Sequence, residues 1–293
     1  MHAARDASQT RIAESGVDGG SAMPELPEIT CRAREMRAAL VGRTIVEVDV
    51  RQPKCLNVTA CAFRKGLVGG KIRDVTPRGK WVITETSRGF FLLNLGMGGE
   101  VLLVSSERLP EKWKVRIGFD DGESLAINFW WFGHAHFAAL DGLADHAPSA
   151  VLGPDALDVS LEGLRAALDG RRGRVKAFLL DQKRIAGIGN AYVHDILFRA
   201  HLHPLRPIPT LCDADVAALH RAIRDELERS IAKGGAYYEL DLYGAPGGFT
   251  GEDLLVGYRE GRPCPACGTT IEKIRTGSTS SFVCPACQPI ERP

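Results

Sequence analysis

The chain has 293 residues, which at roughly 100–200 residues per domain predicts about two domains and room for a small third module. Its hydrophobic fraction of 44% and charged fraction of 25% exclude a collagen-like or disordered chain, and no apolar run reaches the roughly 18 residues that span a bilayer. The formal net charge of +1 indicates no partner, although a neutral total can include a basic face that a polyanion would bind.

The first 40 residues contain a polar stretch and then a helix. Residues 1–22 are polar and aperiodic and have no apolar core, which predicts a disordered tail and no secretory signal. From residue 29 onward apolar side chains recur at helical spacing, and the helix is expected to end near Gly42. Pro27 suits its first turn, and the acidic residues beside it favour the positive end of the helix dipole.

Between residues 43 and 140 the hydrophobic period changes from helical to two. Turns rich in Gly, Pro, Asp and Ser separate the apolar runs. Many short strands with short connections are typical of an antiparallel sandwich or barrel. The expected strands are residues 44–50, 71–75, 81–85, 89–93, 100–104, 115–119, 124–129 and 136–140.

After residues 153–155 the pattern becomes helical. Helices are expected at residues 161–168, 175–181, 191–200 and 213–232. Residues 234–254 contain six glycines, which predicts a mobile loop.

The last 30 residues contain four of the eight cysteines, as two Cys-x-x-Cys pairs separated by 16 residues. This spacing predicts a tetrahedral four-thiolate zinc site on two Cys-x-x-Cys turns, with the two strands of a short hairpin between those turns, expected at residues 269–275 and 280–283. Four protein ligands leave no open position, so the zinc is expected to be structural. Two disulfides or a redox pair are the alternatives, and the uneven cysteine placement favours a reducing cytoplasm. The ligands are Cys264, Cys267, Cys284 and Cys287.

Residues 173–192 combine two predicted helices, a Gly-x-Gly turn at residues 187–189, and several basic side chains beside one acid, Asp181. Glycines allow close approach of a backbone, and the N–H groups that open a helix can bind a phosphate. The alternative is a plain helix hairpin with a solvated basic face.

The motif Pro24-Glu25-Leu26-Pro27-Glu28 follows a methionine. If translation starts at Met23 and that methionine is removed, Pro24 becomes a free secondary amine, a nucleophile that can attack a sugar C1′ and form an iminium. Glu25 is placed to move protons during ring opening. The alternative is ordinary helix-start chemistry.

Together with Lys80-Trp81 and the segment 94–99, these motifs resemble the formamidopyrimidine-DNA glycosylase (Fpg/Nei) family from residue 23 to about residue 288. The resemblance implies an α+β fold: an N-terminal β-sandwich (23–150), a helix–two-turn–helix domain (151–250) and a zinc finger (255–288). It also implies removal of oxidised bases, purines in particular, followed by cleavage of the abasic strand.

The resemblance assigns roles to individual residues. Pro24 is the Schiff-base nucleophile, Glu25 the proton-transfer residue, Glu28 a supporting residue, and Lys80 a phosphate contact that serves in β-elimination. For DNA binding it implies Met97 in the gap left by a flipped base, and Lys176 with Asn190 on phosphate. The expected partner is damaged double-stranded DNA, bound by a monomer without membrane attachment in the cytoplasm or on the nucleoid.

Three departures from the family pattern predict altered behaviour. Residues 1–22 would place the Pro24 nitrogen in a tertiary amide, so the true start is expected at Met23 or the tail is expected to be cleaved. Residues 128–133 read Asn-Phe-Trp-Trp-Phe-Gly where the family usually has Asp-Pro-Arg-Arg-Phe-Gly. Trp130 therefore replaces an arginine beside Phe132, which predicts weaker discrimination of the opposite base, unless Trp130 and Trp131 pack in the sandwich. Thr279 replaces the finger arginine, which predicts mainly β-elimination.

Two other functions compete with this interpretation. One is a catalytically altered paralogue that binds damaged DNA without processing it, which the two replaced arginines favour. The other is a zinc-ribbon transcription or ribosome-associated factor, which explains the finger but leaves Pro24 and Glu25 without a role.

Overall fold

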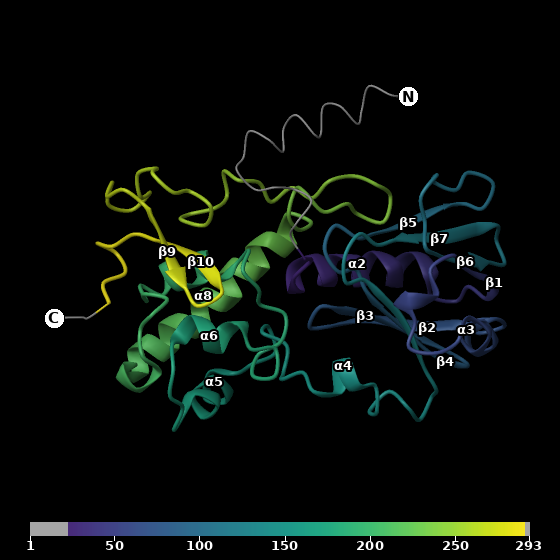
Figure 1. Ribbon diagram of the computed structural model, residues 1–293, viewed down its shortest axis with the longest axis horizontal. Coiled ribbons are helices and arrows are strands. Elements are labelled where there is room, and N and C mark those ends of the chain that lie inside the picture. The colour runs from purple at the N-terminus through teal and green to yellow at the C-terminus, as the bar shows by residue number, and fades with distance from the viewer. Residues whose placement is uncertain (1–22, 291–293) are drawn as a thin grey trace. The chain divides into compact units, whose positions relative to one another are not determined.

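A computed structural model describes residues 23–290, which form two compact units (Figure 1). The N-terminal unit contains residues 23–151 and 233–248, and the C-terminal unit contains residues 152–232 and 249–290. The tail predicted for residues 1–22 lies outside the described residues.

The N-terminal unit contains two antiparallel four-stranded sheets, with strand orders β1-β6-β7-β5 and β2-β3-β4-β8. All eight strands expected between residues 43 and 140 are present, and the predicted sandwich is confirmed. The strands are β1 (Ile45–Val50), β2 (Ile72–Arg78), β3 (Trp81–Thr86), β4 (Gly89–Asn94), β5 (Glu100–Ser105), β6 (Val115–Phe119), β7 (Glu123–Asn128) and β8 (His134–Ala138).

Helix α2 (Leu26–Leu40) lies between the two sheets and shares one core with them (Figure 1). Its residues Ile29, Met36 and Leu40 are at most 1% exposed and pack against side chains from both sheets. Complete burial of an aliphatic side chain contributes about 1.5–3 kcal/mol, so this apolar stripe fixes the helix, and thereby its first turn, against the sandwich.

Short helices connect some strands and were not predicted. Helix α3 (Ala60–Leu67) begins at Thr59, whose hydroxyl accepts the Ala62 N–H at 3.2 Å, and it buries Phe63 and Leu67. The others are the 3₁₀ turn η1 (Pro53–Cys55) and the single turn α4 (Ala147–Ala150).

Segment Lys233–Gly248 packs against the N-terminal unit, and the prediction of a mobile loop at residues 234–254 is wrong for this part. Leu242 is fully buried; its N–H donates to Glu35 at 2.8 Å, and its carbonyl accepts the Leu103 N–H at 2.8 Å. The Arg32 guanidinium donates to the Leu240 carbonyl. The glycines thus allow tight turns within an anchored segment.

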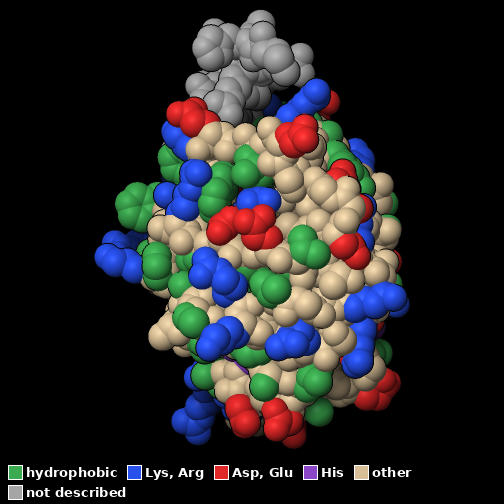
Figure 2. Space-filling view, turned by 90° about the vertical axis from the view of Figure 1, so that its right-hand side faces the viewer, with side chains coloured by type: hydrophobic (Ala, Val, Ile, Leu, Met, Phe, Trp, Pro, Cys, Tyr) green, Lys and Arg blue, Asp and Glu red, His purple; other side chains and the backbone are tan. Residues whose placement is uncertain are grey.

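Basic and acidic side chains are interspersed at the end of the N-terminal unit that carries β1 and α3, and neither sign covers that face (Figure 2). This mixture agrees with the nearly neutral net charge of +1.

The C-terminal unit is helical and carries one hairpin. Its elements are α5 (Leu161–Leu168), α6 (Val175–Leu180), α7 (Val193–Arg199), the 3₁₀ turn η2 (Ile208–Thr210), α8 (Asp213–Ala232), β9 (Glu272–Thr276) and β10 (Thr279–Val283). The four predicted helices correspond to α5, α6, α7 and α8, and the two predicted strands to β9 and β10.

Asp195 of α7 anchors the chain that leads into the finger. Its buried carboxylate accepts the backbone N–H groups of Leu255, Val256 and Gly257 at 2.7–2.9 Å. A buried carboxylate costs free energy unless it is hydrogen-bonded, so these three bonds stabilise the connection between α7 and the finger.

Candidate active site and metal centre

The predicted catalytic residues begin at the first turn of α2. Glu25 is the N-cap residue, is 3% exposed, and forms a reciprocal capping box with Glu28. The Glu25 N–H donates to Glu28 Oε2 at 2.9 Å. Because this bond satisfies a donor at the helix start, the backbone directly after Pro24 is held in one geometry.

Glu28 also binds the Lys233–Gly248 segment. Its second oxygen, Oε1, accepts the Ala236 N–H at 3.0 Å, and its side chain is largely buried. One carboxylate therefore joins the start of α2 to a segment more than 200 residues away in the chain.

Lys80 lies in the tight turn between β2 and β3, where Gly79 adopts a positive φ of 57°. Asn94, at the end of β4, donates from Nδ2 to the Lys80 carbonyl at 3.0 Å and accepts the Gly96 N–H at Oδ1 at 2.9 Å. The Asn94 amide thus connects the turn that contains Lys80 with the segment that leads from Gly96 to Met97.

Met97 pairs with the aromatic loop, which we define as residues 130–132. The Met97 N–H donates to the Trp131 carbonyl at 2.8 Å, and the return bond is 3.4 Å. A Cβ atom on Gly96 would lie 2.1 Å from that carbonyl oxygen, so this close approach requires glycine. Met97 is expected to fill the gap left by a flipped base, and Trp130 to stack on the base opposite that gap. The pairing of Met97 with Trp131 therefore places these two residues close together.

All three side chains of the aromatic loop are exposed: Trp130 by 65%, Trp131 by 63% and Phe132 by 71%. The alternative that Trp130 and Trp131 pack inside the sandwich is therefore wrong. Phe132 has φ of 57°, which is uncommon for an aromatic residue. Contiguous exposed aromatic side chains indicate an interaction site.

The predicted helix hairpin in the C-terminal unit is organised by Gln182. Its Oε1 accepts the Gly187 N–H at 2.8 Å, and its Nε2 donates to the Ile188 carbonyl at 2.7 Å. Asn190 follows this turn; its Nδ2 lies 3.5 Å from the Tyr258 hydroxyl, and its buried Oδ1 has no hydrogen-bond partner within residues 23–290. An unsatisfied buried acceptor beside a glycine turn points to a donor supplied by a ligand or water.

Lys176 lies on α6 and is only 3% exposed. Its ammonium donates to the hairpin between β9 and β10, including the Thr279 hydroxyl at 3.1 Å and the Ser280 carbonyl at 2.6 Å. Burial lowers the pKa of Lys176 to about 8. Two residues expected to contact DNA separately, Lys176 and Thr279, are therefore bonded to each other.

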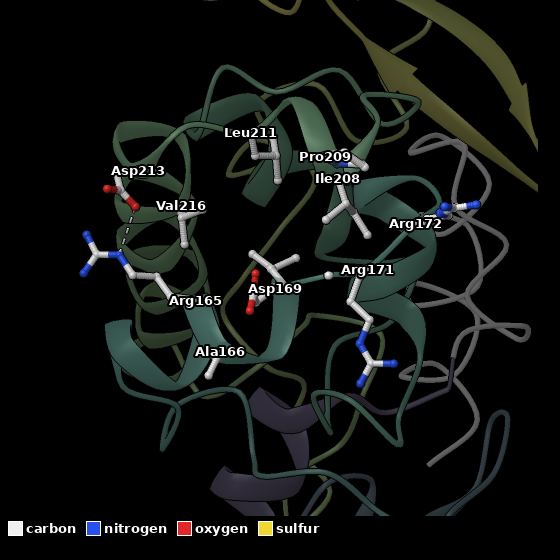
Figure 3. A pocket seen from close by; sticks show the side chains of 12 residues that line it. Arg165, Ala166, Asp169, Arg171, Arg172, Ile208, Pro209, Leu211, Asp213 and Val216 are labelled. Atoms are coloured by element: carbon white, nitrogen blue, oxygen red, sulfur yellow. Dashed lines mark ion pairs between the residues drawn. The ribbon is translucent and has the colours of Figure 1, made fainter.

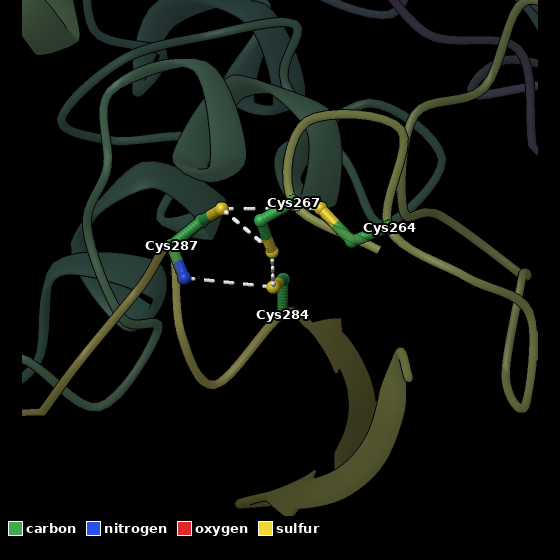
Figure 4. Close-up of side chains that lie close together, drawn as sticks. All are labelled: Cys264, Cys267, Cys284 and Cys287. Carbon is green, nitrogen blue, oxygen red and sulfur yellow. Dashed lines mark hydrogen bonds between the residues drawn. The ribbon is translucent and has the colours of Figure 1, made fainter. Parts of the chain in front are cut away.

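The four cysteine sulfurs lie within 4.8 Å of one another, on the two turns that flank β9 and β10 (Figure 4). Three of the sulfur–sulfur distances are 3.4–3.8 Å, near the roughly 3.8 Å that a tetrahedron with Zn–S bonds of about 2.3 Å requires. A disulfide needs about 2.05 Å, so the disulfide alternative is wrong. The donor set is Cys264, Cys267, Cys284 and Cys287.

A cavity of about 660 Å³ lies elsewhere in the C-terminal unit, between the end of α5 and residues 208–216 (Figure 3). Ile208 and Val216 contribute apolar side chains, and Arg165 pairs with Asp213 at 3.4 Å. None of the predicted site residues lines it.

Comparison with known proteins covers nearly the whole described chain. Models of the formamidopyrimidine-DNA glycosylase N-terminal domain, the formamidopyrimidine-DNA glycosylase H2TH domain and the zinc finger found in FPG and IleRS match residues 23–128, 152–240 and 261–290. The chain is 36% identical over 274 residues to the formamidopyrimidine-DNA glycosylase of Chloroflexus aurantiacus, covering 91% of this chain and 98% of that protein. This chain belongs to the formamidopyrimidine-DNA glycosylase family.

Other relatives agree with this membership. The formamidopyrimidine-DNA glycosylase of Chloroflexus aggregans is 38% identical over 275 residues, covering 91% of this chain and 98% of that protein. Lactococcus lactis Fpg, solved with DNA containing an abasic site, superposes with a TM-score of 0.83 at 26% identity, over 90% of this chain and 99% of that one. MutM, solved with DNA containing carbocyclic 8-oxo-G, superposes with a TM-score of 0.82 at 27% identity, over 91% of this chain and 100% of that one.

The family's zinc finger match and the four-sulfur geometry together assign one structural zinc ion to this member of the formamidopyrimidine-DNA glycosylase family. When bound, the ion holds the two turns at the base of the hairpin. Among residues 23–290 no helix has both the length and the hydropathy to cross a membrane.

Two residues that organise the site were not singled out from the sequence of this family member. Asn94 and Gln182 act through amide groups that bond backbone segments, and such bonds leave no periodic signal. Asn94 ends a strand, and Gln182 precedes the first glycine of the Gly-x-Gly turn by five residues; these positions were the signal available.

Proposed function

We propose that this chain excises oxidised or ring-opened bases, purines in particular, from double-stranded DNA and then cleaves the abasic strand by β-elimination. Its relatives are named formamidopyrimidine-DNA glycosylases, and its structural neighbours were solved with DNA containing an abasic site or Fapy-dG. The observation that carries the proposal is the buried capping box at Glu25 and Glu28, which fixes the backbone directly after Pro24.

The proposed chemistry begins with the ring nitrogen of Pro24. This secondary amine attacks C1′ of the deoxyribose as the bond from C1′ to the damaged base breaks, and the departing base takes up the proton that the amine loses. The sugar ring then opens to an iminium. Glu25 delivers the proton that the sugar oxygen needs on ring opening. Loss of a C2′ proton then breaks the C3′–O bond and cuts the strand, with Lys80 holding the adjacent phosphate.

This mechanism requires Pro24 to carry no acyl group, because the nitrogen of an X–Pro amide has no nucleophilic electron pair. The match to the family's N-terminal domain starts at residue 23, which supports an active form that begins at Pro24 after loss of Met23. The mass of the N-terminal peptide of the native protein tests this requirement.

Trp130 is proposed to stack on the base left without its partner, beside Met97 in the gap. Its exposure of 65% and the backbone pairing of Met97 with Trp131 support this role. An indole stacks on any base, so the preference for cytosine over adenine opposite the lesion is expected to be weak.

Borohydride trapping tests the catalytic proposal, because borohydride reduces an iminium to a stable amine. The form that begins at Pro24 should give a covalent adduct with abasic duplex DNA, and the form with residues 1–23 attached should give none. E25Q should slow trapping by about 100-fold or more. K80A should weaken strand cleavage, whereas K71A, at the exposed Lys71 that precedes β2, serves as its matched control.

A second candidate function is a reader that binds damaged DNA without processing it. The observation that favours it is that Trp130 and Thr279 stand where the family usually has arginines. Tight binding of damaged duplex by the form that begins at Pro24, without any adduct, would support the reader and overturn the enzyme.

A further inference from the structure

Three histidines surround Trp81 on the face of the β2-β3-β4-β8 sheet that points away from the core shared with α2. Side chains alternate along a strand, and Val82 and Ala135 lie in that core, so the residues beside them point the other way. The histidine cluster consists of His134 and His136 on β8 and His146 at the start of α4. In that order, their ring centroids lie 6.1, 5.2 and 5.1 Å from the Trp81 ring, and Trp81 is only 5% exposed.

Hydrogen bonds fix two of these rings, and both are buried. His136 Nδ1 lies 2.8 Å from His146 Nε2, and His146 Nδ1 lies 2.7 Å from the Ser149 hydroxyl. This hydroxyl donates to the His146 carbonyl at 3.4 Å, so its oxygen accepts from His146 Nδ1, and His146 Nε2 accepts from His136 Nδ1. Burial lowers the pKa of both imidazoles, which keeps them neutral. Each donor in this chain has an acceptor, so the two rings are held in one orientation against the indole.

Trp81 anchors the turn that contains Lys80. Arg78 and Trp81 form the last pair between β2 and β3, so the connecting turn consists of Gly79 and Lys80. Within residues 23–290 no ion pair or hydrogen bond holds the Lys80 ammonium, so its location follows from that of the turn. The Asn94 amide restrains the Lys80 carbonyl, and the buried indole restrains the strand that begins directly after it.

We infer that the histidine cluster positions Lys80 for strand cleavage, by holding Trp81 and with it the turn from which the ammonium reaches a phosphate. The inference rests on the proposed function, which gives Lys80 its role. The three histidines are positioning residues, since they act through the indole and need not touch the DNA. In the proposed mechanism the iminium forms at Pro24 without Lys80, so the histidine cluster should affect the elimination step and not the step before it.

The test compares the two steps on duplex DNA with a preformed abasic site, in single turnover at saturating protein. The zinc-loaded protein is used in the form proposed to be active, which begins at Pro24. Borohydride trapping measures the iminium, and a denaturing gel without borohydride measures strand cleavage. W81L removes the ring contacts and H146L breaks the hydrogen-bond chain. Each should trap at the wild-type rate and cleave about 10- to 100-fold more slowly, because a displacement of about 1 Å can cost that much.

Three further variants complete the experiment. W81F keeps an aromatic ring and should cleave nearly as fast as the wild type, whereas K80A gives the loss expected without the ammonium. W113F is the matched control, at a buried tryptophan that lies under the Arg51 guanidinium at 3.7 Å and outside the histidine cluster.

The outcomes separate the inference from the function on which it rests. If K80A is slow while W81L and H146L cleave like the wild type, the inference is overturned. It is also overturned if trapping and cleavage slow equally in W81L and H146L, because that pattern indicates a general loss of structure. A wild type that forms no adduct, or a K80A variant that cleaves at the full rate, would instead overturn the proposed function.

Discussion

The aromatic loop and the finger hairpin place their functional groups in opposite ways. The loop exposes three large apolar side chains on a backbone fixed by Met97 and Gly96, whereas the hairpin buries a lysine beneath hydroxyl groups. Within residues 23–290, the loop leaves apolar surface exposed, and the charge of the hairpin has no carboxylate partner. Removing a loop side chain should therefore affect binding alone, and changing the hairpin should affect both folding and binding.

Loss of zinc should have the largest effect on the hairpin. In C284A the four-thiolate set is incomplete, and the zinc-binding free energy that folds such fingers, on the order of 10 kcal/mol in peptides, is lost. We expect zinc content to fall from one ion to none and DNA binding to fall with it. C212A, at an exposed cysteine outside the cluster, should keep both. Full DNA affinity without zinc would contradict a role for the finger in binding.

Loss of the buried ammonium should have the next largest effect. K176M leaves the acceptors of the hairpin tip without their donor, and unsatisfied buried groups cost about 1–3 kcal/mol each. Urea unfolding should show the C-terminal unit destabilised by about 3 kcal/mol. A variant as stable as the wild type would show that water replaces the ammonium.

Truncation of the aromatic loop should leave folding unchanged and weaken binding. Trp130 is 65% exposed, so W130A should change stability by no more than about 0.5 kcal/mol. Its affinity for the abasic duplex should fall by about 1–3 kcal/mol, the value of one stacked base. V46A, at an exposed apolar residue on β1, is the control.

The same position tests discrimination of the opposite base. W130R introduces a guanidinium that can bond a base edge, so it should raise the excision ratio for a lesion opposite cytosine over one opposite adenine. A strong cytosine preference already present in the wild type would show that the indole is not what contacts the orphaned base.

The smallest expected effect is on the pH dependence of stability. It comes from two buried histidines, His136 and His146. His136 Nδ1 and His146 Nε2 lie 2.8 Å apart, and burial lowers the pKa of His136 to about 4 and also lowers that of His146. The unfolded rings bind protons near pH 6.5, so stability is complete above that pH and falls as the pH decreases toward 4.

Urea midpoints at pH 7.5 and pH 5 measure this dependence. The wild type should be less stable at pH 5, and H136L, which removes one member of the pair, should show a smaller difference between the two pH values. An unchanged difference in H136L would assign the acid sensitivity to other groups.

Much of the fold could be predicted because hydrophobic period and turn chemistry are local properties. The eight strands of the sandwich, the four helices and the zinc hairpin follow from alternation, spacing and cysteine pairs. The anchored Lys233–Gly248 segment could not be predicted, because its glycines indicate turns but its bonds go to Glu28 and Glu35, about 200 residues away.

The sequence alone determined the zinc ligands, the Pro24-Glu25 motif and the replacement of two family arginines, because residue identity and spacing decide these features. The tertiary structure decided which side chains are exposed and which are paired. Trp130 lies in solvent because Met97 and Gly96 hold its loop away from the core, and Lys176 lies beneath Thr279 because α6 packs on the finger hairpin. Such contacts join residues 100 positions apart, and no local pattern encodes them.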